Sequence, residues 1–248
     1  AQLCSDETFV RRVYLDVLGA LPTIQEADQF LADKAADKRK QLIDDLLSRP
    51  EFALFWAQKW GDLLRVSRKQ IGLNSVFKYS QWIQSAVASN MPYDQFARDI
   101  LTVSGSTITS PAGNFYRTSG DTLDAMESTA QLFLGTRIQC AKCHNHPFER
   151  WTQNNYYGLA SFFNRVERRR TDQPEEIILW TRSDGEVHHP ADGRVMKPWV
   201  PVSGELDVTA QADRRIALAE WLTTAENPYF ARVEVNRIWA QVMGRGIV

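Results

Sequence analysis

Cysteine, net charge and long apolar runs are all scarce in this sequence. Three cysteines in 248 residues are too few for the disulfide framework of a small secreted scaffold. The 29 basic and 30 acidic residues leave a formal net charge of -1, so we expect no binding to nucleic acid or to an anionic membrane surface. No apolar run approaches the roughly 20 residues that a transmembrane helix needs. We therefore expect no membrane-spanning segment in this chain.

Familiar catalytic and phosphate-binding motifs are also missing. The sequence shows no Ser/His/Asp set, no phosphate-binding loop and no paired-carboxylate motif. Gly244-Arg245-Gly246 has the spacing G-x-G, but it lacks the preceding strand and the third glycine of a dinucleotide site. The residues with distinctive chemistry are therefore the cysteines and histidines.

Hydrophobic periodicity predicts helices over most of the chain. Apolar residues recur at helical spacing, while glycine, proline and capping residues mark the ends of the segments. Thr23 and Glu26, for example, form a capping box, and Pro50 is typical of a first helical turn. The predicted helical ranges are 6–18, 23–33, 37–48, 50–64, 75–89, 93–102, 121–134, 156–163, 212–224 and 229–243, with a loop at 103–120.

A change of pattern after Arg170 indicates a small sheet. Residues 177–180 are strand-like, and Asp184-Gly185 and Asp192-Gly193 are turn signals about eight residues apart. We expect a three-stranded antiparallel β-meander from Ile177 to Val202. The predicted fold class is mainly α, a multi-helix domain with this small meander.

The most distinctive motif is Cys140-Ala141-Lys142-Cys143-His144. This C-x-x-C-H run is the attachment signature of a c-type haem. Two thiols on one short turn can each add to a vinyl group, and the following histidine can ligate the iron. The motif therefore predicts haem c bound covalently by Cys140 and Cys143, with His144 as the iron ligand.

His146 leaves a second interpretation open. With it the run becomes C-x-x-C-H-x-H, and Cys140, Cys143, His144 and His146 could instead hold zinc. A third possibility is a cofactor-free pair of thiols or a local disulfide. Under the haem interpretation, His146 is too close to His144 along the chain to reach the opposite face of the ring. Cys4 stands alone and is expected to be a buried or free thiol.

The second axial ligand of such a haem has no clear signature. The candidates are His189, Met196, His188 and Met126, with His189 and Met196 slightly favoured. His188 and His189 are adjacent on the predicted meander, so strand alternation sends them to opposite faces. An open position is equally compatible with the sequence, and it would favour a haem enzyme over a pure electron carrier.

Several stretches of the chain are characteristic of one bacterial family. They are residues 6–16, 19–23, 130–135, 140–148 and 155–163. Through them, residues 1–170 resemble the planctomycete-type cytochrome-like domain of unknown function. From Arg215 onward, residues 219–222, 227–232 and 235–239 resemble the start of the companion domain of unknown function that usually follows it.

The resemblance implies a domain division and a cellular location. We expect a helical cytochrome-like domain at 1–170, a meander and linker at 171–210, and the helical start of a truncated companion domain at 211–248. The family name implies a protein of the bacterial envelope, periplasmic or at the cell surface. The chain would then be a fragment of a larger exported protein that transfers electrons to a redox partner protein.

Overall fold

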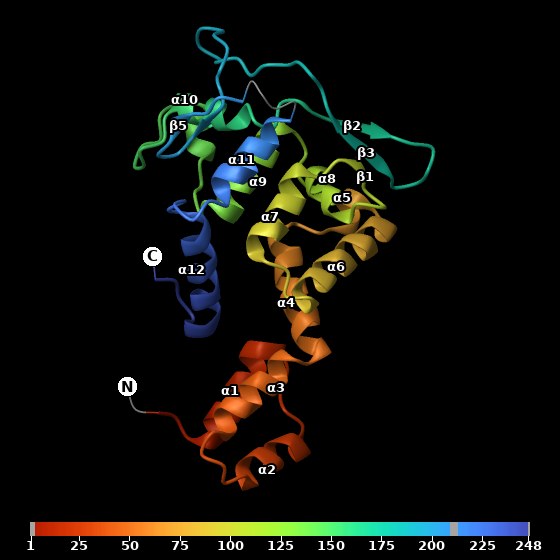
Figure 1. Cartoon of the computed structure of the whole chain (residues 1–248), viewed down its shortest axis with the longest axis vertical. Helices are drawn as coiled ribbons and strands as arrows, with labels where there is room; N and C mark the ends of the chain where they lie inside the picture. Colours follow the sequence, from red (N-terminus) through yellow and green to blue (C-terminus); the bar gives the residue numbers. More distant parts are fainter. Residues whose placement is uncertain (1–2, 209–212, 248) are drawn as a thin grey trace.

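The computed structural model describes residues 3–208 and 213–247, and this part of the chain is mainly α-helical, as the sequence predicts. Figure 1 shows the helices. Their bounds are α1 Asp6–Leu18, α2 Ile24–Ala32, α3 Lys38–Leu47, α4 Pro50–Leu63, α5 Arg68–Ile71, α6 Leu73–Ala88, α7 Tyr93–Thr102, α8 Phe115–Thr118, α9 Thr122–Phe133, α10 Gln153–Ala160, α11 Arg214–Leu222 and α12 Phe230–Met243. Two 3-10 helices, η1 Pro111–Asn114 and η2 Gln139–Lys142, complete the helical elements of the described residues.

The ends of the first helices follow from local capping chemistry. Gly19 ends α1 in the left-handed region at φ 69°, a conformation that costs glycine little. Thr23 and Glu26 form the predicted capping box of α2, and Pro50 occupies the first turn of α4. These predicted helix boundaries are confirmed to within one or two residues.

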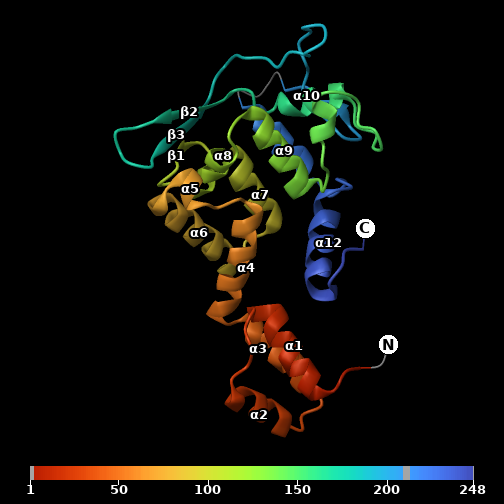
Figure 2. The same cartoon turned by 180° about the vertical axis from the view of Figure 1, so that it is seen from behind.

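Two hydrophobic cores lie at different heights along the molecule. The smaller core joins α1, α2 and α3 and includes Phe30 and Leu46. The larger core gathers the remaining helices around Phe133, Tyr156 and Ile83. Figure 1 shows α1–α3 as a lobe at one end, connected to the main body by α4. Figure 2 shows α12 beside the main body and, on the opposite side, the small sheet.

The segment 103–120 is not the open loop that its composition predicts. It contains β1 (Gly105–Ser106), η1 and α8, and it is buried at Phe115 and Tyr116. The Tyr116 hydroxyl donates to the carbonyl of Leu101 at 2.6 Å. Small residues here permit close packing, because a Cβ on Gly113 would lie 2.8 Å from Leu179. Composition alone could not separate such a close-packed segment from a solvent-exposed loop.

The three-stranded antiparallel sheet is present, but its strands are not those of the predicted meander. The strand order is β1-β3-β2, with β2 at Val166–Arg170 and β3 at Ile177–Thr181. The 177–202 prediction is therefore correct only for its first strand. The charged segment 166–170 pairs along its length with 177–181, because backbone hydrogen bonds do not depend on side-chain polarity. After β3, a single bridge joins His188 to Val195. A separate hairpin then pairs β4 (Trp199–Val200) with β5 (Gly204–Glu205).

The last two helices agree with the predicted ranges where they are described. The predicted start of a helix at residue 212, and the domain boundary at 210–211, lie outside the described residues. In the part of the chain that is described, no helix has the length and apolar character needed to cross a bilayer.

Candidate functional site

The C-x-x-C-H run forms a surface loop that starts as η2. Ala141 is fully buried and anchors the loop in the main core. On either side of it, Cys140 and Cys143 are exposed and carry free thiols, and His144 is exposed as well. The loop therefore presents two thiols and an imidazole to solvent from one short turn. Cys4, in contrast, is a partly buried free thiol at the start of the chain.

The N-terminal half of α10 holds this loop in place. The carbonyl of Lys142 accepts hydrogen bonds from the Gln153 side-chain amide at 2.9 Å and from the Tyr157 hydroxyl at 3.2 Å. The side-chain oxygen of Asn145 accepts from the backbone N–H of Gln153 at 3.1 Å. Sequence reasoning did not identify these supporting residues. The sequence feature that could have located them is the pair Thr152 and Asn155, which forms a capping box and fixes where α10 begins.

Hydrogen bonds assign different tautomers to the four histidines of the chain. In His144, Nδ1 lies 2.7 Å from the carbonyl oxygen of Asn145. A carbonyl can only accept, so Nδ1 carries the proton and Nε2 keeps its lone pair. His188 is arranged in the same way, with Nδ1 at 2.9 Å from the carbonyl of Gly193. Both residues are exposed, so both present a free lone pair of the kind that metal ligation requires.

His146 and His189 have the opposite arrangement. Nδ1 of His146 accepts from the backbone N–H groups of Phe148 at 3.3 Å and Glu149 at 3.0 Å. Nδ1 of His189 accepts from the N–H of Ala191 at 3.2 Å. In the neutral ring the proton then lies on Nε2, which leaves no free lone pair. His146 therefore closes a turn of the loop, and His189 closes the turn that follows it.

The four residues of the zinc alternative are not gathered into a metal site. Within residues 3–208 and 213–247, no group of three or more histidines, cysteines, aspartates or glutamates is placed to hold a metal ion. His146 also uses Nδ1 within its own turn. Attachment of a c-type haem would need only two thiols and one histidine with a free Nε2.

The candidate second ligands occupy different environments. Met126 is fully buried on α9 inside the main core, and Met196 is 8% exposed. His189 is 7% exposed while His188 is exposed, in agreement with the predicted alternation. The ring of His189 meets Tyr157 edge-on at 6.0 Å, and Tyr157 in turn contacts the carbonyl of Lys142. Tyr157 thus connects the 188–195 bridge to the C-x-x-C-H loop.

Two further contacts attach the end of the loop to the rest of the molecule. Trp151 is buried against Trp199 with the ring centroids 6.5 Å apart. The guanidinium of Arg150 lies over the Trp151 ring and donates to the hydroxyl of Tyr229 just before α12. Phe148, which precedes Arg150 and Trp151 in the chain, is 93% exposed.

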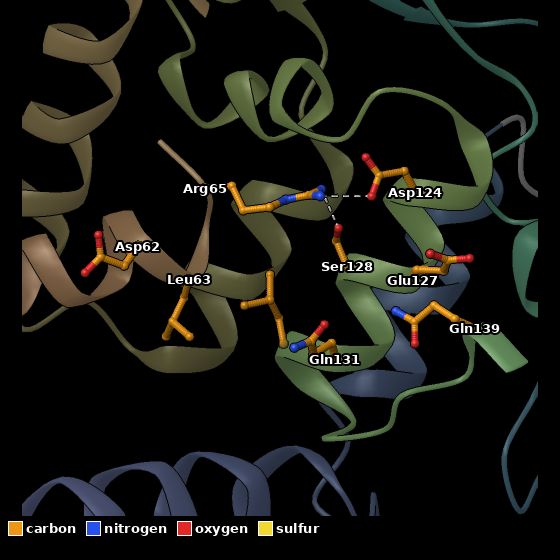
Figure 3. Close-up of a pocket in the computed structure, with 9 residues that line it drawn as sticks. Asp62, Leu63, Arg65, Asp124, Glu127, Ser128, Gln131 and Gln139 are labelled. Atoms are coloured by element: carbon orange, nitrogen blue, oxygen red, sulfur yellow. Dashed lines mark hydrogen bonds and ion pairs between the residues drawn. The ribbon is translucent and has the colours of Figure 1, made fainter. Parts of the chain in front are cut away.

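A polar cavity of about 450 Å³ adjoins the start of the loop. Its walls come from the end of α4, from α9 and from Gln139, the residue before Cys140. Figure 3 shows the Arg65 guanidinium extended toward Asp124 and Ser128, at 3.0 and 2.7 Å. This ion pair spans α4 and α9 and fixes one wall.

Glu127 forms the part of the cavity wall nearest α10. Its carboxylate accepts a hydrogen bond of 2.5 Å from the hydroxyl of Tyr156. Burial raises the pKa of Tyr156, and the neighbouring Glu127 carboxylate raises it further, so the phenol stays protonated. The bond fixes Glu127 in its position on the cavity wall.

Comparison with protein families gives two matches that divide the chain. The PSCyt2 model, described as a protein of unknown function (DUF1549), matches residues 1–168. The PSD1 model, described as a protein of unknown function (DUF1553), matches residues 214–248. The predicted resemblance to this pair of domains is confirmed at the level of the families. Searches of curated proteins and of solved structures give no match.

Proposed function

We propose that this chain is a c-type haem protein that transfers electrons in the bacterial cell envelope. The chain belongs to the PSCyt2 family, whose function is unknown, so the proposal is argued from the chain's own residues. Cys140 and Cys143 would hold the haem, and His144 would ligate its iron. The observation that carries this proposal is the tautomer of His144. Its Nδ1 donates to the Asn145 carbonyl at 2.7 Å, and its Nε2 lone pair faces solvent beside two exposed thiols.

The residues of the loop are suited to attachment and orientation. The exposed thiols can each add across a vinyl group, forming a C–S bond while the thiol proton moves to the neighbouring vinyl carbon. The Nδ1 hydrogen bond of His144 fixes the ring orientation and increases the basicity of Nε2. Gln153 and Tyr157 hold the loop through the Lys142 carbonyl. A haem bound here would supply a one-electron iron couple.

Among the candidate second ligands, tautomer favours His188, which is exposed and has a free Nε2, whereas Nδ1 of His189 is engaged with Ala191. Position favours His189, because its ring meets Tyr157, which contacts the loop at the Lys142 carbonyl.

The thioether of Met196 carries no proton that could block ligation, but Met196 is buried. Met126 is enclosed within the core. If none of the candidates ligates, an open sixth position would favour the alternative of a haem enzyme over a pure electron carrier.

The proposal is tested by expressing the chain in the periplasm of cells with haem-maturation machinery. We expect a Soret band whose haem survives acid–acetone extraction, because thioether bonds are not broken by this treatment. Cys143→Ala should lose most of the covalently retained haem. Cys4→Ala is the matched control and should retain all of it, since Cys4 precedes α1 in the separate α1–α3 lobe.

Two other results would each reject haem attachment. Colourless protein with one zinc per chain would favour the zinc alternative, in which the C-x-x-C-H-x-H cluster stabilises a structural or binding module. Colourless protein without metal, whose Cys140 and Cys143 react with maleimide only after reduction, would favour a local disulfide.

A further inference from the structure

A second cavity continues the polar cavity of Figure 3 away from the loop. It has a volume of about 360 Å³ and lies between α4 and α12, which are separated by some 170 residues in the chain. Asp62 and Leu63 line both cavities, so the two adjoin at the end of α4. Together they form a groove, called here the α4 groove, from α12 past Leu63 to Gln139.

The second cavity supplies flat apolar surface. Trp56 and Trp60 line it on the α4 side, and Gln241 lies opposite on α12. The indole nitrogen of Trp56 donates to the carbonyl of Val17. The guanidinium of Arg237 lies over the Trp60 ring at 5.1 Å from its centroid, so Trp60 contributes only the part of its ring that Arg237 leaves uncovered. Both indoles are therefore fixed in orientation. An apolar ring face of a ligand can pack against such indoles without reordering them.

Unpaired hydrogen-bonding groups occur along the whole groove. The carboxylate of Asp62 and the side-chain amides of Gln131, Gln139 and Gln241 make no hydrogen bond to any described residue. An amide both donates and accepts, while a carboxylate accepts only. A ligand that satisfies these groups must carry several groups that both donate and accept, which hydroxyls do.

Most charges of the groove neutralise each other within it. Arg65 pairs with Asp124 at 3.0 Å, and Arg237 pairs with Glu234. Burial raises the pKa of Glu234, which further lowers its negative charge at mildly acidic pH. The remaining charges of the groove are of both signs, with the carboxylates of Asp62 and Glu127 negative and the ammonium of Lys59 positive. A ligand with a single strong charge would meet a like charge in the lining, so the charge pattern favours an uncharged ligand.

We propose that the α4 groove binds a neutral oligosaccharide. A pyranose combines an apolar C–H face, which suits Trp56 and Trp60, with hydroxyls that donate to Asp62 and exchange hydrogen bonds with the glutamine amides. An elongated chain would extend from the indoles to Gln139, next to Cys140. The binding needs no haem, so it is separable from the function proposed above.

The test is isothermal titration of the full chain, without haem, against cellohexaose, laminarihexaose, xylohexaose and mannohexaose. We expect at least one to bind with a dissociation constant below about 1 mM and to change tryptophan fluorescence. Asp62→Ala should weaken that binding by roughly tenfold, because a charged hydrogen-bond acceptor is lost. Gln139→Ala should weaken binding of the hexaose and leave that of the disaccharide unchanged if the chain extends toward the loop.

Matched controls separate the groove from the rest of the surface. Asp28→Ala removes an exposed carboxylate on α2, and Trp239→Ala removes a 44% exposed indole on α12 that does not line the groove. Both should bind like the wild type. The proposal is overturned if no hexaose binds at about 10 mM, or if folded Asp62→Ala binds as tightly as wild type. It is also overturned if trigalacturonate or spermidine binds more tightly than every neutral hexaose.

Discussion

In the C-x-x-C-H loop, His144 and His146 use their Nδ1 atoms in hydrogen bonds of opposite direction. His146 uses Nδ1 to accept two backbone N–H groups and so closes its turn. His144 donates Nδ1–H to a carbonyl and keeps Nε2 free. The zinc alternative would use both histidines as ligands, but their hydrogen bonds differ. The difference arises from which backbone groups each ring meets, and the residue spacing does not specify this.

The same distinction gives a prediction for the second ligand of the proposed haem. In haem-loaded, reduced protein, His188→Ala should give fast carbon monoxide binding and a high-spin spectrum, because the sixth ligand is lost. His189→Asn is the matched control, since its side-chain oxygen can still accept from Ala191. It should bind carbon monoxide as slowly as the wild type.

The measurement is stopped-flow mixing with carbon monoxide. Fast binding by His189→Asn and slow binding by His188→Ala would assign the ligand to His189 instead. Fast binding by the wild type itself would show an open position and contradict ligation by either residue.

At the scale of elements, α10 connects the candidate site to the segment after the sheet. One side of the helix holds the C-x-x-C-H loop through Gln153 and Tyr157. At Gly158 its backbone closely approaches β4, where a Cβ would lie 2.7 Å from Cβ of Trp199 and 3.3 Å from the carbonyl of Lys197. Glycine therefore sits inside this helix because the hairpin packs directly on it.

Gly158→Ala should destabilise the protein by about 1–3 kcal/mol, since the added methyl group overlaps neighbouring atoms. Gly61→Ala is the matched control on α4, where the nearest side-chain atom is 3.9 Å from the new Cβ. That change should stabilise by about 0.5–1 kcal/mol, because alanine loses less backbone entropy in a helix. Urea denaturation of both variants measures the two effects, and equal signs would contradict the packing described.

Across the whole molecule, Arg215 joins segments that are distant in the chain. It is fully buried and pairs with Asp213 at 2.6 Å. It also donates to the carbonyl of Val103 after α7 and to Thr181 of β3, at 3.0 and 3.2 Å. The region matched by PSD1 is thereby fastened to the region matched by PSCyt2.

Arg215→Ala should cost about 3–5 kcal/mol, because it leaves the Asp213 carboxylate without its counter-charge and the Val103 carbonyl without this donor. Arg182→Ala removes an exposed ion pair with Glu167 and should cost less than about 1 kcal/mol. Chemical denaturation compares the two. A similar small loss for both variants would show that Arg215 does not fasten the two regions together.

Much of the local structure follows from nearby residues alone. The capping box at Thr23, the proline of α4 and the glycine after α1 act over three or four residues, so they could be predicted from spacing. The C-x-x-C-H run likewise predicts haem attachment from local spacing, because both thioether bonds would form within one turn. The mainly helical fold class follows from apolar periodicity in the same way.

Long-range pairing decided the rest. The charged strand Val166–Arg170 pairs with Ile177–Thr181, and the serine- and glycine-rich segment 103–120 is packed into the core. The meeting of α4 with α12 around Asp62 likewise joins segments that are far apart in the sequence. Local periodicity carries no information on such contacts, because they are selected by the packing of the whole chain.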